Sequence, residues 1–158
     1  MELHSKANKV LTCVMCENLE RLYERGNRLE NEKLYEDAIQ TWQEGLGLLY
    51  ELQQDYEAIN QFLAAIGDVY FLRMNMYADA YEFFNKDRGY GGYGNPFNML
   101  RLGECCLELG DKQNAIEYLL RAYMMEGKEI FEPDVDGDDD GRKYFEFLKT
   151  YVNLNKSG

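Results

Sequence analysis

The sequence has very few of the residues on which hydrolytic and histidine-based metal chemistry depends. It contains one histidine, His4, and two serines, Ser5 and Ser157, all close to its ends. A Ser-His-Asp triad needs all three side chains in one place, and many metal sites use several histidines. The composition therefore argues against most familiar hydrolases before any motif is considered.

Long apolar runs are also lacking. Stretches such as 62–66 fall far short of the roughly 20 apolar residues that span a bilayer. The opening segment MELHSKANKV lacks the apolar core and cleavage site of a secretory signal. We therefore expect a cytoplasmic protein whose cysteines, Cys13, Cys16, Cys105 and Cys106, are free thiols.

Positive charge is scarce. The 158 residues include 17 Lys and Arg against 29 Asp and Glu, which gives a formal charge of −12. Binding to nucleic acid or to an anionic membrane is disfavoured because both need a basic surface. A basic protein partner is permitted. Residues 126–140 hold eight acids and one base, Lys128, and so carry −7 of the total.

Proline is nearly absent from the periodic part of the chain. The only two, Pro96 and Pro133, are expected in connections. Elsewhere apolar residues recur at spacings of three and four, as in Leu34, Ala38 and Trp42, and no segment alternates like a strand. The sequence therefore predicts an all-α protein.

Three glycines mark an internal repeat. Each is followed by an alanine after 12, 13 and 12 residues, and each alanine by a bulky apolar residue four positions later. The sets are Gly26, Ala38 and Trp42; Gly67, Ala80 and Phe84; and Gly103, Ala115 and Leu119. Each set predicts a helical hairpin whose helices approach closely at the small residues. The one extra residue of the second set is expected in its turn.

This pattern resembles the tetratricopeptide repeat, and RLGECCLELGDKQNAIEYLLRAY carries the resemblance best. The resemblance implies an α-α superhelix of helical-hairpin repeats at about 19–54, 60–86 and 96–126. We expect 1–158 to form a single domain, with an acidic loop at 132–141. A capping helix at about 142–154 should then cover the last repeat, as solenoids require.

The groove of a tetratricopeptide array is lined by the first helix of each repeat, which points to a set of candidate partner-binding residues. These are Tyr23, Asn27, Glu30 and Asn31; Gln61, Ala64, Asp68 and Phe71; and Phe97, Leu100, Arg101, Glu104 and Glu108. They either simply face water or form an acidic and aromatic groove for a basic, partly apolar ligand. Asp68 and Glu104 are the one facing carboxylate pair that an enzyme could use.

The segment RGYGGYGNPF is the most distinctive local sequence. It matches G-x-G-x-x-G, but a phosphate-binding loop needs a preceding strand, and a helix at 78–85 is predicted here. We expect a long loop before a helix that Asn95 caps and Pro96 begins. Tyr90 and Tyr93 either pack on the repeats or are presented to a partner.

Two cation-binding motifs are incomplete. In DVDGDDDG, Asp136, Asp138 and Asp140 match the start of a calcium loop, but Phe147 stands where the bidentate glutamate belongs. Adjacent cysteines on a helix point to different faces, which suits a tetrahedral zinc site poorly. We expect no metal or other cofactor, a solvated acidic loop, and core positions for Cys105 and Cys106.

The runs AAIGDVYF, GNPFNMLRLGECCLELG and RAYMMEGKEIF are similar to those of short bacterial tetratricopeptide proteins, some of which are immunity partners of polymorphic toxins. The resemblance implies a non-enzymatic protein, monomeric when free, that binds and neutralises a basic toxin domain. Two alternatives stay open. One is a general adaptor or co-chaperone for a peptide segment, and the other is a calcium-dependent or redox-sensing protein.

Overall fold

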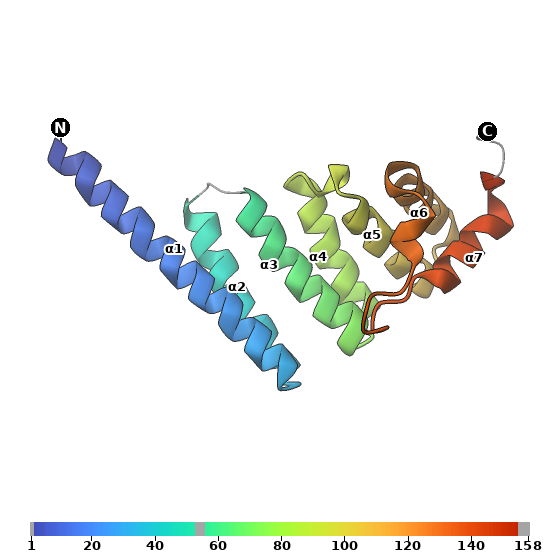
Figure 1. Ribbon diagram of the computed structural model, residues 1–158, viewed down its shortest axis with the longest axis horizontal. Helices are drawn as coiled ribbons and strands as arrows, with labels where there is room; N and C mark the ends of the chain where they lie inside the picture. Colours follow the sequence, from blue (N-terminus) through green and yellow to red (C-terminus); the bar gives the residue numbers. More distant parts are fainter. Residues whose placement is uncertain (1, 53–55, 155–158) are drawn as a thin grey trace. The chain divides into compact units, whose positions relative to one another are not determined.

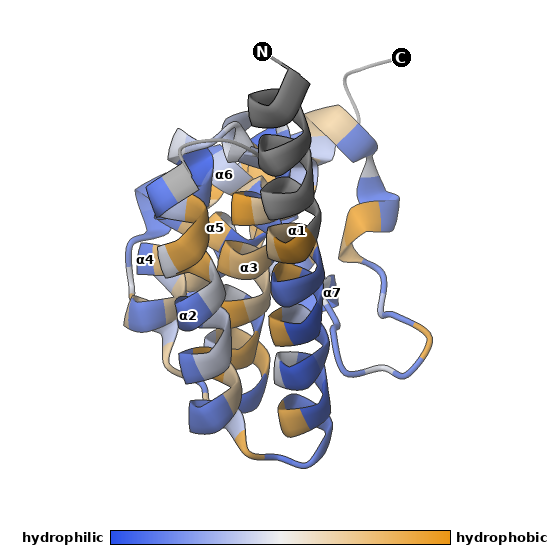
Figure 2. Cartoon of the chain, turned by 90° about the vertical axis from the view of Figure 1, so that its left-hand side faces the viewer, coloured by the Kyte–Doolittle hydropathy of each residue, from blue (hydrophilic) through white to orange (hydrophobic). Residues whose placement is uncertain are grey.

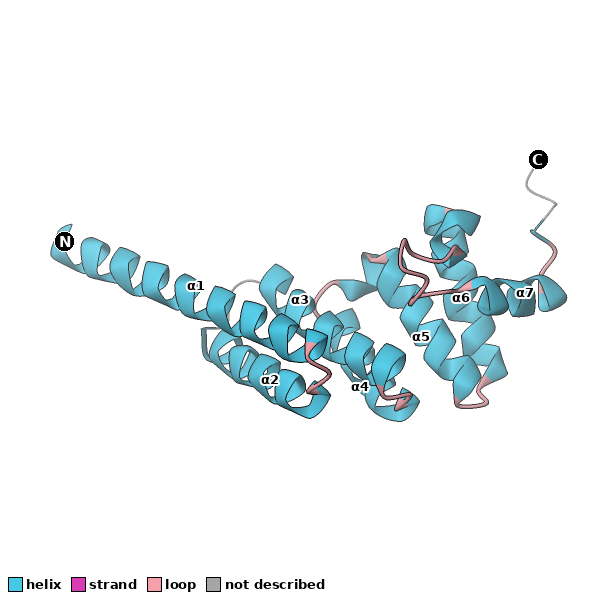
Figure 3. Cartoon of the chain, turned by 60° about the horizontal axis from the view of Figure 1, so that its bottom comes forward, coloured by secondary structure: helices cyan, strands magenta, loops and turns pink. Residues whose placement is uncertain are grey.

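The structure is a computed structural model that describes residues 2–52 and 56–154, with side chains described over 14–51 and 56–154. The described residues form helices and loops and no strand (Figure 3). The all-α prediction is confirmed. The side chains of His4, Ser5, Cys13 and Ser157 lie outside the described part.

The chain runs through seven α-helices and three short helical turns in the described residues (Figure 1). They are α1 (Glu2–Asn31), α2 (Tyr35–Leu52), α3 (Tyr56–Asp68), η1 (Val69–Arg73), α4 (Tyr77–Gly89), η2 (Gly92–Gly94), α5 (Pro96–Glu108), α6 (Lys112–Glu126), η3 (Lys128–Phe131) and α7 (Arg142–Tyr151). Helix α4 matches the helix predicted at 78–85 but is longer, since it continues to Gly89.

The chain divides into two compact units, Met1–Phe62 and Leu63–Gly158. The first unit contains α1, α2 and the beginning of α3. The second contains the rest of α3 and the helices from η1 to α7, together with the acidic loop between η3 and α7.

The repeat glycines lie directly against the bulky residues with which the sequence pairs them. A Cβ atom added at Gly26 would lie 2.1 Å from Trp42 Nε1, one at Gly67 2.6 Å from Phe84 Cζ, and one at Gly103 2.6 Å from Leu119 Cγ. The three repeat alanines are fully buried. Because real side chains do not approach so closely, only glycine permits this helix spacing, and the predicted close approach is confirmed.

The three hairpin turns share one backbone pattern. Each has three residues between its helices, and the middle one has a positive φ: Lys33 (64°), Asn75 (54°) and Gly110 (84°). The amide of the last turn residue bonds back into the preceding helix, from Leu34 to the Leu29 carbonyl and from Asp111 to the Cys106 carbonyl. These bonds satisfy carbonyl groups that a helix end otherwise leaves unpaired.

The extra residue of the second repeat lies in the helix and not in the turn. The equivalent turn bond, from Met76 to the Tyr70 carbonyl, spans one residue more than in the other repeats. Just before it, α3 passes into the π-helical turn η1, where the Met74 amide bonds to the Val69 carbonyl. A helix accommodates a single inserted residue as a π-helical turn. The expectation of a longer turn is therefore wrong.

Helix α7 closes the second unit. Its Tyr144 and Leu148 are buried in the same core as Phe84, Met99 and Leu119. The ring of Phe145 stacks on Phe131 with centroids 5.0 Å apart. This helix therefore covers α6 in the way predicted for a cap.

Hydrophobic and hydrophilic residues form bands along α1 and α2, which is typical of amphipathic helices (Figure 2).

Within the described residues, no helix combines the length and the apolar character needed to cross a bilayer.

The contact between Gly26 and Trp42 predicts opposite effects for two glycine-to-alanine changes in the first unit. Gly26→Ala should lower the free energy of unfolding by about 1–3 kcal/mol, because the new methyl group overlaps the indole. It should also shift the fluorescence of Trp42, the only tryptophan, whose Nε1 donates to the Tyr23 carbonyl at 3.2 Å.

The matched control is Gly47→Ala in α2, where an added Cβ meets nothing within 4 Å. Removing a flexible glycine from an open helical position should stabilise the protein by about 0.5–1 kcal/mol. Urea unfolding measures both effects. Equal stability of the two variants would contradict the close packing at Gly26.

Candidate functional site

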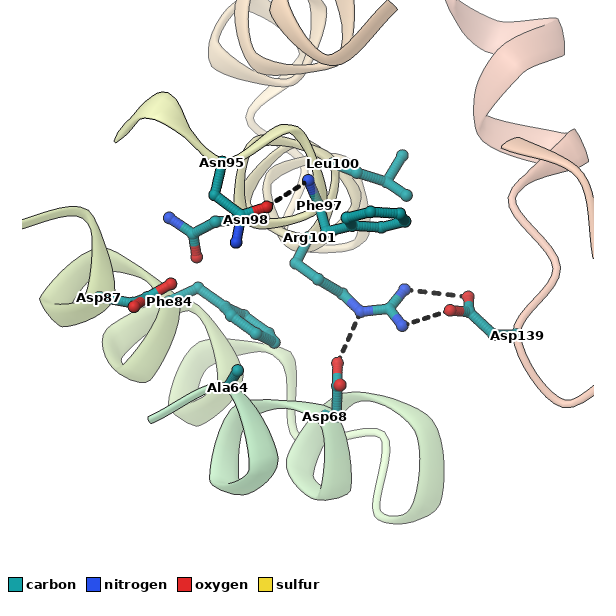
Figure 4. Close-up of a pocket in the computed structure, with 10 residues that line it drawn as sticks. All are labelled: Ala64, Asp68, Phe84, Asp87, Asn95, Phe97, Asn98, Leu100, Arg101 and Asp139. Atoms are coloured by element: carbon teal, nitrogen blue, oxygen red, sulfur yellow. Dashed lines mark hydrogen bonds and ion pairs between the residues drawn. The ribbon is translucent and has the colours of Figure 1, made fainter. Parts of the chain in front are cut away.

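Arg101 of α5 is paired with carboxylates from three parts of the second unit. Figure 4 shows the pairs with Asp68 and Asp139. The Nε of Arg101 donates to Asp68 Oδ1 at 2.7 Å, and its Nη1 donates to Glu104 Oε1 at 3.2 Å. Its two terminal nitrogens hold Asp139 of the acidic loop in a bidentate pair at 3.0 and 2.5 Å. The guanidinium also lies over the ring of Phe71, 5.1 Å from its centroid. Arg101 therefore joins α3, α5, η1 and the acidic loop.

Burial shifts the pKa values of several groups in this cluster. Arg101 is only 7 % exposed, and burial alone would lower its pKa, but the surrounding carboxylates raise it, so it stays protonated. Glu104 is 1 % exposed, and burial raises its pKa to about 8 against the opposing effect of Arg101. Glu104 is thus mostly neutral at pH 7. Burial likewise raises the pKa of Asp68, and its ion pair with Arg101 opposes that shift.

The acidic loop is tethered, and this corrects the expectation of a merely solvated segment. Three consecutive aspartates each pair with a different arginine. The pairs are Asp138 with Arg73 (3.1 Å), Asp139 with Arg101 (2.5 Å) and Asp140 with Arg142 (2.7 Å). Two of the three residues that match a calcium loop thus point to separate arginines and not to one common centre.

A hollow of about 210 Å³ opens beside Arg101, and we call it the Asp87 hollow (Figure 4). Its walls come from α3, α4, α5 and the acidic loop. The lining residues are Ala64, Asp68, Phe84, Asp87, Asn95, Phe97, Asn98, Leu100, Arg101 and Asp139.

Two buried side chains of this hollow have an unsatisfied acceptor. Asp87, in the last turn of α4, is 2 % exposed, and Asn98 of α5 is 3 % exposed. Among the described residues, neither Asp87 Oδ1 nor Asn98 Oδ1 has a hydrogen-bond partner. Burial raises the pKa of Asp87 to about 6. Buried polar atoms nearly always have partners, so two such acceptors in one hollow need an explanation.

The glycine-rich loop accounts for the burial of these two residues. A Cβ at Gly92 would lie 2.7 Å from both the carbonyl oxygen and Oδ2 of Asp87, so only glycine lets the loop close over it. The Gly92 carbonyl accepts a hydrogen bond from Asn98 Nδ2 at 3.3 Å. Asn95 then caps α5 by accepting from the Phe97 amide at 2.9 Å, and Pro96 begins the helix, as predicted.

A second hollow, of about 320 Å³, adjoins the first and shares Phe97, Leu100 and Asp139 with it. We call it the Glu129 hollow. Its other lining residues are Glu126, Glu129, Ile130, Glu132 and Asp134. Together the two hollows form what we call the acidic groove, which is lined by seven carboxyl side chains and one base, Arg101.

The first unit brings together three of its five predicted residues, and Asn31 is one of the two that it leaves out. Tyr23, Asn27 and Gln61 line a hollow of about 480 Å³, whereas Glu30 is not part of its wall. The ring of Tyr23 packs edge-on against Phe62, with centroids 5.5 Å apart. This hollow carries two acidic side chains, Glu20 and Glu24, and is therefore much less acidic than the groove of the second unit.

Several predicted residues of the second unit are buried. Phe71 is 7 % exposed and lies beneath Arg101, and Arg101 and Glu104 are themselves buried. Glu108 accepts from the Tyr144 hydroxyl at 2.9 Å and also pairs with Lys143, so it holds α7 against α5. These four side chains organise the unit and are not open to a partner in the way that the sequence suggested.

The two loop tyrosines differ in their surroundings. Tyr93 is 47 % exposed, and the Arg121 guanidinium lies 4.6 Å from the centroid of its ring. Tyr90 is partly buried, and its amide donates to the Asp87 carbonyl at 2.9 Å. The sequence left packing and presentation open, and Tyr93 combines packing on α6 with an exposed face.

The cysteines occupy different environments. Cys105 and Cys106 are buried in the core, as predicted, and burial raises the pKa of the Cys106 thiol to about 11. Cys16 is exposed. Over the side chains that the structure describes, no three or more His, Cys, Asp or Glu residues are grouped so that they could hold a metal ion.

The sequence interpretation missed Asp87, Asn98 and the pairing role of Asp139. A sequence feature does point toward that pairing. Arg101 stands between Leu100 and Leu102 and has only Glu104 as an acid within one turn, so a buried Arg101 needs further acids from elsewhere in the fold. The sequence around Arg101 thus indicates that it has acidic partners but does not identify Asp68 or Asp139.

No protein-family model matches this chain, and its comparison with curated proteins gave no significant match.

The buried Glu104 predicts a stability that falls as the pH rises through neutrality. In the unfolded chain Glu104 loses its proton near its ordinary pKa of 4.5, whereas in the folded protein its pKa is about 8. The folded state therefore binds more protons between these values, and the free energy of unfolding decreases with rising pH. Glu104→Gln should abolish the decrease between about pH 6 and pH 8, measured by urea unfolding.

Asp87 also makes the free energy of unfolding fall with rising pH, but at lower pH, because folding raises its pKa from 3.8 to about 6. The Glu104→Gln variant should retain this contribution of Asp87. Glu117→Gln is the control, since Glu117 is exposed on α6 and pairs only with Arg121 at 3.1 Å in the described contacts. A wild-type stability that is constant or rises between about pH 6 and pH 8 would show that Glu104 is not neutral in the folded protein.

Proposed function

We propose that this chain is a non-enzymatic protein-binding module whose acidic groove recognises a basic partner, and that the partner is a toxin domain that the chain neutralises. The observation that carries the proposal is the composition of the groove. Seven carboxyl side chains line it, and its one base, Arg101, already pairs with three of the chain's own acids.

The charge of the groove is available to a partner. The aspartates Asp138, Asp139 and Asp140 pair with arginines of the chain, but Glu126, Glu129, Glu132 and Asp134 lie exposed along the Glu129 hollow. Such a surface attracts a basic protein over long distances and raises its association rate. It repels nucleic acid and anionic lipid, since these carry the same sign of charge.

The groove also offers apolar contact area. The ring of Phe97 is 62 % exposed where the two hollows meet, and Leu100 and Ile130 lie beside it. An exposed aromatic ring surrounded by polar side chains is the usual form of an energetically important anchor. A basic and partly apolar segment therefore fits this surface better than a purely ionic one.

The other functions have less support. The facing carboxylates Asp68 and Glu104 both pair with Arg101, and Glu104 is buried, so they do not form an accessible acid and base. The toxin-neutralising role rests on the resemblance to short bacterial tetratricopeptide immunity proteins. A general peptide adaptor would use the same groove without protecting a cell.

Co-expression tests the toxin-neutralising role. If a gene for a toxic domain with a basic surface lies beside the gene for this chain, bacteria that produce that domain should grow only when the chain is co-expressed. Persistent growth arrest with the chain present in soluble form would contradict neutralisation.

Charge removal in the groove tests the recognition mechanism. Glu126→Gln, Glu129→Gln and Glu132→Gln combined should slow association with the purified toxin domain at least tenfold and flatten its salt dependence. The control combines Glu36→Gln, Glu82→Gln and Glu117→Gln, three exposed acids outside the groove. Equal association rates for the two triple variants, measured by stopped flow, would contradict recognition through the groove.

A further inference from the structure

We propose that the Asp87 hollow is a receptor for one arginine side chain of the basic partner, whose guanidinium N–H groups donate to Asp87 Oδ1 and Asn98 Oδ1. The proposal rests on the proposed function and goes further, because it assigns a pocket, a chemical group and two acceptor atoms to the recognition.

The first support is the match between donors and acceptors. The two unsatisfied atoms of the hollow are both hydrogen-bond acceptors. Asn98 Oδ1 is an amide oxygen, which only accepts, and Asp87 Oδ1 only accepts once Asp87 is ionised. They come from α4 and α5, and Figure 4 shows both side chains directed toward the same space beside Phe84. A guanidinium carries five donors and no acceptor, so it satisfies both atoms without adding a new unsatisfied one.

The second support is that Asp87 has no compensating cation on its own helix. It lies in the last turn of α4, where the helix dipole disfavours a negative charge. The neighbouring bases are engaged elsewhere: Lys86 lies over the Phe83 ring at 4.7 Å, and Arg88 donates to the Tyr118 hydroxyl at 2.8 Å. A buried carboxylate in this position is costly unless a cation pairs with it, and the bases of α4 leave that place open.

The third support is the charge of the remaining wall. The other charged groups that line the hollow are Asp68, Asp139 and Arg101. Arg101 is held by the two aspartates and by Glu104, and Asp68 still has 43 % of its side chain exposed. The hollow is therefore negative as a whole, which favours a cationic guest over a neutral donor.

Size and aromatic content favour arginine over a small cation. About 210 Å³ is the room of several water molecules, at roughly 30 Å³ each, and suits a long side chain. Phe84 lies in the wall, and the exposed Phe97 stands at the rim. Guanidinium groups stack on aromatic rings and are more weakly hydrated than ammonium groups, so they enter such a pocket at a lower desolvation cost.

A titration with N-acetyl-arginine amide tests the site without the partner. Nuclear magnetic resonance should show saturable shifts of the Asn98 side-chain amide, and N-acetyl-citrulline amide, which has the same shape but no charge, should bind at least tenfold more weakly. Asp87→Asn should weaken arginine binding at least tenfold. Glu82→Gln removes the same charge from the exposed face of α4 and should leave it unchanged.

Two further measurements keep the test decisive. Ala64→Leu retains Asp87 and Asn98 but fills the hollow, so it should abolish binding even where Asp87→Asn does not fold. Binding should also strengthen severalfold from about pH 5 to pH 7, because Asp87 becomes ionised in this range. Arginine binding that survives both variants, or that citrulline matches, overturns the proposal.

The outcomes separate this proposal from the proposed function. If the triple Glu→Gln variant of the groove loses the toxin domain while Asp87→Asn keeps both the toxin and the arginine probe, the pocket assignment is wrong and the recognition of a basic partner stands. If the arginine probe binds at Asp87 but the chain does not bind or neutralise the toxin domain, the pocket stands and the proposed function is wrong.

Discussion

The buried guanidinium of Arg101 is the interaction on which the candidate site depends. An arginine at 7 % exposure is tolerated only where carboxylates surround it, because removing a partner from a buried ion pair costs several kcal/mol. Asp68 supplies one carboxylate from α3, and Asp139 supplies another from the acidic loop. Both segments are therefore fixed beside α5. The acidic groove exists because the loop that carries much of the chain's negative charge is held there.

The close packing of the repeat helices also shapes the site around Arg101. Gly67 admits the ring of Phe84 between α3 and α4, and the same ring forms part of the wall of the Asp87 hollow. The π-helical turn η1 supplies two side chains that position the site: Phe71 lies beneath Arg101, and Arg73 pairs with Asp138 of the acidic loop. Such turns are frequent at functional sites. Here the turn that takes up the inserted residue also carries two side chains of the candidate site.

Much of the fold follows from local sequence patterns. The glycine, alanine and bulky-residue sets predict the hairpins, and Asn95 with Pro96 predicts the start of α5, because these effects act within one or two turns of a helix. The location of the extra residue could not be predicted in this way, since a turn and a π-helical turn both accommodate it. Tertiary packing selects between them.

The candidate site was only partly predictable for a similar reason. Helical spacing brings Arg101 and Glu104 to one face, but Arg101 and Asp139 are 38 residues apart, and only the folded loop brings them together. Asp87 has no unusual sequence context. Its importance comes from the closure of Gly92 over it, which is a tertiary contact. Local periodicity thus identifies the helix that carries the site and not the side chains that complete it.

We propose that basic segments bind in the acidic groove of the second unit and not in the hollow of the first. The most direct measurement is a nuclear magnetic resonance titration of the whole chain with an arginine-rich peptide, at low and at high salt. Binding in the groove should place the largest shifts at Phe97, Leu100 and Ile130, and these shifts should decrease strongly as salt is added. Shifts confined to Tyr23, Asn27 and Gln61, or shifts that do not depend on salt, would contradict it.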